Sequence, residues 1–261
     1  IVLGLYYLTN GPWLTEHLSP KVGVLTAEEV HRALDHNAIS LHTEIKVLLP
    51  DEKEPVTTTG GRVLFNEALP DGLPFYNETM NKKRLSNLVG DCYARVGQIG
   101  TIEMLDNLKN LGFHESTVAG ISISMKDLAV PDNKTAVIDA AVDEVTSVTD
   151  RFNNGVITEN ERYNMIVDIW THTTERIAND LFDRLGEPDT KEKELNPVHM
   201  MVDSGARGSK QQIRQLAGIR GLMAKPSGEI IETPITSNFK EGLTVLEYFV
   251  STHGARKGLA D

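Results

Sequence analysis

The 261-residue chain lacks several features on which whole classes of protein depend. It has one cysteine, Cys92, so it cannot form an internal disulfide, and a zinc site built from thiolates is not expected. Its longest apolar run, residues 1–8, is far shorter than the ~20 residues of a membrane-spanning helix, and no signal-peptide pattern precedes it. We therefore expect a cytoplasmic protein that has no membrane partner.

Basic residues are also scarce, because 26 Lys and Arg stand against 37 Asp and Glu, a formal net charge of −11. On total charge alone, nucleic acid is a poor partner. The composition, 40% apolar and 24% charged, fits one or two globular domains and excludes a disordered or collagen-like chain. The eight histidines show no HExxH pattern and no Asp-x-Asp-x-Asp run is present, so no metal or cofactor bound by this chain is predicted.

The first 120 residues carry mixed signals. Short apolar runs at 45–49 and 62–65 are separated by Pro and Gly, which favours short strands and loops over long helices. Two segments favour helices, at 26–36, which opens with a capping-box pattern, and at 91–111. We predict a mixture of short strands and helices here, within an α+β fold that becomes predominantly helical in its C-terminal half.

From about residue 131 the apolar residues recur at three- and four-residue steps, the pattern of one helix face. After a polar break at 153–155, Thr158 and Glu161 form a second capping box, and helical spacing continues to about residue 186. This pattern predicts a long antiparallel helical hairpin over 131–186, roughly 25 to 35 Å long at about 1.5 Å per residue. Two alternatives stay open: the hairpin is buried in a bundle, or it projects as a docking arm.

Residues 196–225 reverse the charge of the chain. This segment contains five basic residues and one acidic residue, Asp203, which gives it a net charge of +4. The remainder of the chain therefore carries −15. Such an island is expected where a polyanion is handled at one place only. The alternative is that these are ordinary solvated helix charges.

The run DSGARGS at 203–209 has the features of a small anion-binding loop. Its two glycines let backbone amides turn toward a ligand, and Ser209 is expected to cap a helix over 210–216. A helix N-terminus attracts phosphate, and Arg207 adds a permanently charged, bidentate donor beside it. The loop is not a Walker motif, because the Gly-Lys-Ser/Thr ending is absent.

A final helix is predicted to begin at 239–241 and to run to the last residue. Gly254 and Gly258 fall on one face of it, each costing ~1 kcal/mol relative to alanine. Either another backbone or a nucleic acid approaches there, or the helix is built to bend; the alternative is a glycine pair tolerated in a buried helix. Because the chain starts with isoleucine and its last helix has no stop signal, we expect a piece of a larger protein.

Several long motifs share one resemblance. SGARGS, RQLAGIRGLMAKP, ETPI and STHGARKGLAD, all within 196–261, resemble the F-loop and the start of the bridge helix in the largest (β′) subunit of bacterial DNA-dependent RNA polymerase. IVLGLYYLT, TTGGRVLFNEALP and GISIS resemble its pore region, and GVITENERYNMIVDIW is similar to its funnel and rim helices. The resemblance implies four regions: the pore or secondary channel at 1–125, the funnel with its rim-helix hairpin at 126–195, the F-loop at 196–236 and the N-terminal half of the bridge helix at 237–261.

The resemblance also implies roles for single residues near the substrate. Arg207 corresponds to an arginine that contacts the triphosphate of the incoming nucleotide, and Arg214 to a neighbouring basic residue of the substrate-binding region that supports the bridge helix. Gly254, Arg256, Lys257 and Gly258 fall in the bridge helix, which crosses the active-site cleft and flexes during translocation.

At the hairpin, the resemblance implies a regulator-binding site. Tyr163 and Asn164 match rim-helix positions that help bind guanosine tetraphosphate together with a partner factor, and Asp168 matches a factor-contact position. Some members of the family have a lysine after this Tyr-Asn pair, where Met165 stands here. The missing cation argues against alarmone binding, whereas docking of transcript-cleavage factors depends on shape and several charges and is less affected.

For the whole enzyme, the resemblance implies a DNA-binding nucleotidyltransferase, hence a transferase, that acts in transcription. Its expected partners are the β, α, ω and σ subunits, template DNA, RNA, nucleotides and secondary-channel regulators. The three aspartates that hold the catalytic Mg²⁺ would lie before residue 1, so the chain alone is expected to hold no catalytic residue and to be inactive. The alternative from another class is a stand-alone helical-hairpin interaction module with a phosphate-binding loop.

Overall fold

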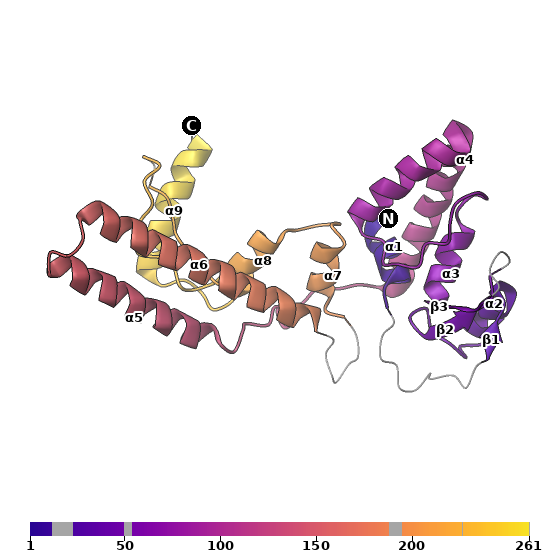
Figure 1. Cartoon of the computed structure of the whole chain (residues 1–261), viewed down its shortest axis with the longest axis horizontal. Coiled ribbons are helices and arrows are strands. Elements are labelled where there is room, and N and C mark those ends of the chain that lie inside the picture. Colours follow the sequence, from indigo (N-terminus) through magenta and orange to yellow (C-terminus); the bar gives the residue numbers. More distant parts are fainter. Residues whose placement is uncertain (12–22, 50–53, 188–194, 226, 261) are drawn as a thin grey trace. The chain divides into compact units, whose positions relative to one another are not determined.

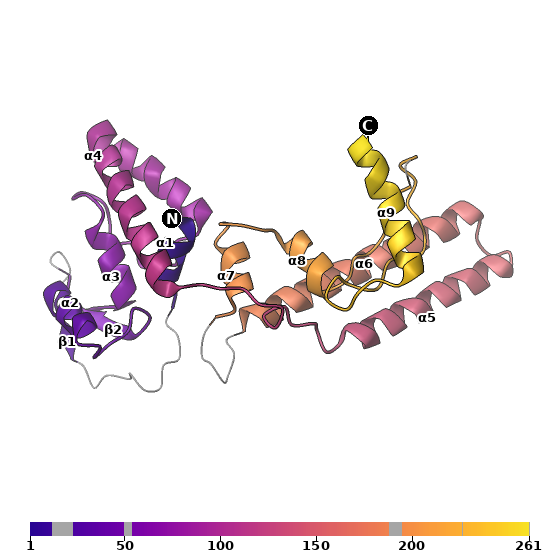
Figure 2. The same ribbon diagram turned by 180° about the vertical axis from the view of Figure 1, so that it is seen from behind.

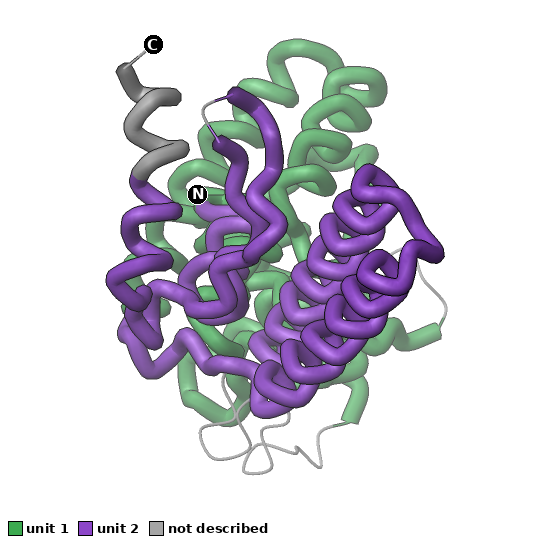
Figure 3. Tube along the Cα trace, turned by 90° about the vertical axis from the view of Figure 1, so that its left-hand side faces the viewer, with its two compact units in different colours: residues 1–123, 188–207 green, residues 124–187, 208–261 purple. Residues whose placement is uncertain are grey.

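The computed structural model describes residues 1–11, 23–49, 54–187, 195–225 and 227–260, with side chains up to residue 252. The chain forms two compact units, which Figure 3 colours separately: unit 1 holds residues 1–123 and 188–207, and unit 2 holds residues 124–187 and 208–261. Helices dominate, and one small sheet is present, so the predicted helix-rich α+β fold is confirmed. None of the helices in the described ranges is long and apolar enough to cross a membrane.

Unit 1 combines a three-stranded sheet with helices. Its elements are α1 (Val2–Thr9), β1 (Val24–Leu25), α2 (Ala27–Asp35), β2 (Glu44–Val47), β3 (Val56–Thr59), α3 (Gly60–Glu67), α4 (Lys82–Ala119) and α7 (Pro197–Asp203). The strand order is β1-β2-β3, with β1 parallel and β3 antiparallel to β2, where Ile45 pairs with Thr58. Alternate residues of β2 are buried, and Ile45 and Val47 pack with Val30 of α2.

The predicted helix at 26–36 is confirmed as α2, together with its capping box. The backbone N–H of Thr26 donates to Glu29 Oε2 at 2.8 Å, and the N–H of Glu29 donates back to Thr26 Oγ1 at 3.4 Å. Because both partners lie within one turn, this boundary could be predicted from four consecutive residues.

The predicted helix at 91–111 lies within α4, which is longer than predicted and spans 38 residues. The preference for a short strand at 62–65 is wrong, because this run lies in helix α3. A run with only three consecutive apolar residues, 63–65, has no period that separates a strand from a helix, so packing decides. In α4, Asn81 caps the first turn and Gly97, with φ of +84°, breaks the helical geometry, so α4 consists of two helices joined at a kink.

Helix α1 packs closely against α4, as Figures 1 and 2 show from opposite sides. The close approach depends on glycine, because a Cβ at Gly4 would lie 2.0 Å from the carbonyl oxygen of Gly112 in α4. No side chain can be accommodated there without moving one backbone away from the other.

We expect Gly4→Ala to lower the free energy of unfolding of the chain by about 3 kcal/mol, since backbone must shift to relieve the overlap. Gly90→Ala in α4 is the matched control, because nothing lies within 4 Å of a Cβ there. That control should stabilise the helix by ~1 kcal/mol. Urea unfolding measures both, and equal effects of the two substitutions would contradict the packing argument.

Unit 2 is built on the hairpin of α5 (Lys134–Asn153) and α6 (Glu159–Gly186), which lie side by side in Figure 1. It also contains α8 (Lys210–Ala217) and α9 (Val245–Ala260). The predicted hairpin is confirmed, and so is its second capping box: Thr158 N–H donates to Glu161 Oε2 at 2.8 Å and Glu161 N–H to Thr158 Oγ1 at 3.4 Å. The inner faces of the hairpin meet in an apolar cluster that holds Ala141, Val148, Ile166 and Trp170.

The last helix begins later than predicted, at Val245 and not at 239–241. Residues 238–241 form a separate turn, in which the Glu241 N–H donates to Asn238 Oδ1 at 2.8 Å. Gly242 follows with φ of +89°, which a helix cannot contain. Thr244 then caps α9, because its side chain accepts from the Glu247 N–H at 3.3 Å.

Candidate functional site

The loop at 203–209 is anchored at its N-terminal end by helices of unit 1. The Tyr6 hydroxyl of α1 donates to Asp203 at 2.7 Å, and burial together with this carboxylate raises the pKa of Tyr6. The Lys82 N–H of α4 donates to the Ser204 carbonyl at 2.8 Å. Gly205 and Gly208 adopt φ of +72° and +89°, the left-handed conformation that glycine accommodates without strain.

Arg207 extends from this loop into solvent. Its backbone N–H donates to the Met201 carbonyl at 3.2 Å, which fixes the main chain while the side chain is exposed. Among the described residues, none forms an ion pair with its guanidinium. A positioned, uncompensated arginine is suited to a bidentate contact with phosphate or carboxylate.

The helix predicted after the loop is confirmed as α8, and Ser209 caps it by accepting from the Gln212 N–H at 3.3 Å. Ser209 and its helix belong to unit 2, whereas Arg207 belongs to unit 1. Lys210, the first residue of α8, lies with Nζ 4.1 Å from the centre of the Phe182 ring of α6. This cation is therefore engaged within unit 2.

Two further arginines of the basic island are partly buried in unit 2. The Nε atoms of Arg214 and Arg220 are buried and have no hydrogen-bond partner among the described residues. Burial lowers the pKa of both guanidinium groups, and no carboxylate offsets it. Arg220 stacks over the Phe239 ring at 4.9 Å. A buried N–H donor without an acceptor is costly, and for Arg220 the stacking on Phe239 offsets part of this cost. Sequence reasoning counted Arg220 in the island but gave it no role.

The three predicted regulator positions of α6 differ in exposure. The Tyr163 hydroxyl donates to the Ile230 carbonyl at 3.1 Å, so it holds the chain beyond α8 against the hairpin. Asn164 and Asp168 are exposed, and so is Met165. Of the predicted set, Asn164 and Asp168 therefore have exposed side chains, whereas the Tyr163 hydroxyl is engaged within the unit.

Sequence reasoning missed Arg162, which forms ion pairs near the hairpin turn with two carboxylates, those of Glu159 and Glu232. Its guanidinium, with the side chain only 15% exposed, donates to both carboxylate oxygens of Glu232 at 2.8 and 2.9 Å. It also lies 5.4 Å from the centre of the Phe152 ring. Because Glu232 is 70 residues away, no local pattern could have indicated this pair.

Asp168 lines a groove of about 260 Å³ along the hairpin. The groove runs between α5, which contributes Glu144, and α6, which contributes Asp168, His172 and Arg176. His172 Nδ1 lies 2.9 Å from the Asp168 carbonyl oxygen and 3.3 Å from its carboxylate, and these contacts raise the pKa of His172. The groove is therefore lined by side chains of both charges.

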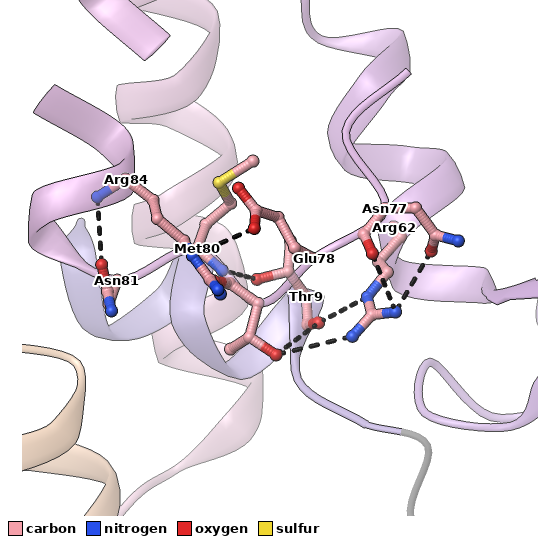
Figure 4. A network of polar contacts seen from close by, with 8 residues as sticks. Thr9, Arg62, Asn77, Glu78, Met80, Asn81 and Arg84 are labelled. Carbon is pink, nitrogen blue, oxygen red and sulfur yellow. Dashed lines mark hydrogen bonds and ion pairs between the residues drawn. The ribbon is translucent and has the colours of Figure 1, made fainter. Parts of the chain in front are cut away.

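A polar network joins two of the pore-like motifs in unit 1, as Figure 4 shows. Arg62 of α3 donates from Nε to the Thr9 carbonyl at 2.9 Å and from a terminal nitrogen to Asn77 Oδ1 at 3.1 Å. Thr9 Oγ1 accepts from the Met80 N–H at 2.8 Å. Burial lowers the pKa of Arg62, and its acceptors are mainly carbonyl and amide oxygens, so this arginine has a structural role.

The predicted bridge-helix positions Gly254, Arg256, Lys257 and Gly258 fall in α9, but their side chains lie outside the described residues. In the described part of α9, Val245, Leu246 and Phe249 are exposed. Within the described ranges no group of three or more His, Cys, Asp or Glu residues could hold a metal ion.

The sequence matches two family models of one class of protein, which together cover most of the chain. Residues 1–128 match RNA polymerase Rpb1, domain 3, and residues 157–240 match RNA polymerase Rpb1, domain 4. The chain thus belongs to the RNA polymerase largest-subunit family.

Three similar relatives are subunits of the same family. The chain is 50% identical to the DNA-directed RNA polymerase subunit β′ of Methylacidiphilum infernorum, 47% to that of Nitrosococcus oceani and 48% to that of Aquifex aeolicus. Each alignment covers the whole of this chain and 20%, 20% and 17% of the relative, respectively. The chain therefore spans about a fifth of the length of the curated relatives it matches.

Proposed function

We propose that this chain acts in transcription as part of a cytoplasmic DNA-directed RNA polymerase, a nucleotidyltransferase assembled from β′, β, α, ω and σ subunits. The observation that carries the proposal is Arg207, an exposed arginine without an ion pair among the described residues, on a loop anchored to α1 and α4. In this role it contacts the triphosphate of the incoming nucleotide. The catalytic Mg²⁺ is held by residues outside this chain, and the chain alone is inactive.

The other regions receive roles that follow from the same proposal. Unit 1 lines the secondary channel through which nucleotides enter, and the α5–α6 hairpin forms the rim where transcript-cleavage factors and other regulators dock. The exposed Asn164 and Asp168 support this docking role. Arg214 supports the bridge helix, and α9 is the first half of that helix. A stand-alone hairpin module is not favoured, because the whole chain aligns with β′ subunits.

A segment exchange tests the proposed function directly. We expect an Aquifex aeolicus β′ subunit, with its aligned segment replaced by these 261 residues, to assemble with its partner subunits and synthesise RNA on a DNA template. The matched control carries Gly4→Leu, which forces α1 away from α4 and should block assembly. An exchanged enzyme that assembles but makes no RNA would contradict the proposal.

A further inference from the structure

The base of the hairpin is tied to the segment that leads into α9. Lys134, the first residue of α5, has a side chain only 8% exposed and donates to the carboxylate of Glu241 in a close ion pair. Lys240, which immediately precedes Glu241, donates from Nζ to the Leu128 carbonyl at 2.7 Å, just ahead of α5. Two consecutive residues of the 238–241 turn therefore reach the same end of the hairpin.

The 238–241 turn is also attached to the end of α8. Asn238 is fully buried, and its side-chain amide donates to the carbonyls of Ala217 and Gly218, each at 3.0 Å. These carbonyls lie at the C-terminus of α8, where the last carbonyl groups of a helix have no N–H donor within the helix. The turn consequently has two attachments, one to α8 and one to the base of α5.

The first turn of α9 is also hydrogen-bonded to the residues around this turn. Glu247 of α9 accepts from the Thr244 N–H at 2.9 Å and from the Ser237 N–H at 3.2 Å. Ser237 immediately precedes the turn, so Glu247 holds the first turn of α9 to the residues that Asn238 and Glu241 fix. A displacement of the turn relative to α5 would therefore move the beginning of α9.

The hairpin contacts the same stretch of chain a second time near its own turn. Arg162 pairs with Glu232, and Tyr163 donates to the Ile230 carbonyl. The stretch from Ile230 to Glu241 is thus held by α6 at one end and by α5 at the other. Of the two ion pairs, only Lys134 with Glu241 acts next to α9.

We propose that Lys134 and Glu241 are positioning residues: their ion pair fixes the position of the first turn of α9 relative to the base of the hairpin. A protein bound to the hairpin would then influence nucleotide addition by moving α9. This inference rests on the proposed function. Neither residue touches substrate. Removing Glu241 leaves the enclosed charge of Lys134 uncompensated, and removing Lys134 frees the partly exposed Glu241, so either change releases the turn from the hairpin.

The test compares variants in the complete polymerase that carries this chain. We expect Lys134→Met and Glu241→Gln each to lower the maximal rate of single-nucleotide addition roughly tenfold, with the KM for nucleotides unchanged. A cleavage factor should bind both variants as tightly as the parent, but its stimulation of transcript cleavage should fall. Lys134→Arg should keep the parent rate, and the exchange of Lys134→Glu with Glu241→Lys should recover part of it.

Asp132→Asn is the matched control, since Asp132, just ahead of α5, forms an exposed ion pair with Arg184 of α6 at 2.6 Å in the same unit. It should leave the rate unchanged. Parent-like kinetics of Lys134→Met, or an equal loss in Lys134→Arg, would overturn the positioning role while the parent enzyme remains active. Failure of the proposed function would show differently, as an inactive parent enzyme.

Discussion

Replacing Arg207 with alanine in the complete polymerase is expected to raise the apparent KM for nucleoside triphosphates about 10- to 100-fold. A hydrogen bond to a charged group contributes ~1.5–3 kcal/mol, and each 1.4 kcal/mol corresponds to a factor of ten. The side chain is exposed and forms no ion pair with the described residues, so its removal leaves no buried charge behind. The loss should therefore appear in nucleotide kinetics and not in folding.

Two variants sharpen this experiment. Arg207→Lys keeps the charge but not the planar, bidentate donor, so it should lie between the parent and Arg207→Ala. Arg151→Ala removes an exposed arginine near the turn of the hairpin and is the control for a simple loss of positive charge. Steady-state nucleotide incorporation measures all three, and an unchanged KM in Arg207→Ala would remove this residue from the substrate site.

The second large effect concerns factor docking. We expect the double substitution Asn164→Ala and Asp168→Ala to reduce stimulation of transcript cleavage by a cleavage factor at least roughly tenfold, because a few residues carry most of the binding energy of a protein–protein interface. Elongation without the factor should be unchanged. Cleavage assays over a range of factor concentrations measure the effect.

Substitution is a sharper test than removal of the hairpin turn. Deleting 153–164 should also abolish stimulation, but it removes Arg162 and Tyr163, whose contacts hold the 230–232 stretch. Asp143→Ala, an exposed aspartate of α5, is the matched control and should retain stimulation. If the double variant responds to the factor as the parent does, docking does not use this face of α6.

Local signals in the sequence predicted much of the fold. The two capping boxes, the polar turn at 153–155 and the Ser209 cap were all predicted correctly, because each depends on residues within one helical turn. The same local reading was wrong where glycine geometry or packing decides. Gly97 joins two helices into α4, and Gly242 delays the start of α9 to Val245.

In the candidate site, too, the sequence indicated some features and packing decided others. Sequence alone drew attention to Arg207, Asn164 and Asp168, which the structure leaves exposed. It also gave Tyr163 a docking role, whereas the hydroxyl of this residue is bonded to the Ile230 carbonyl. The roles of Arg207, Arg214 and the α9 residues in catalysis and translocation stay predictions for the experiments above.

The sequence by itself determined the family, the helix-rich α+β class, the hairpin and the helix cap that follows the loop at 203–209, since motifs, caps and periodicity are properties of neighbouring residues. Only the tertiary structure decided which charges are available. Asp203 is bound by Tyr6, Arg162 by Glu232 and Lys134 by Glu241, across separations of 197, 70 and 107 residues. No periodic pattern spans such distances, because these partners are brought together by the packing of whole helices.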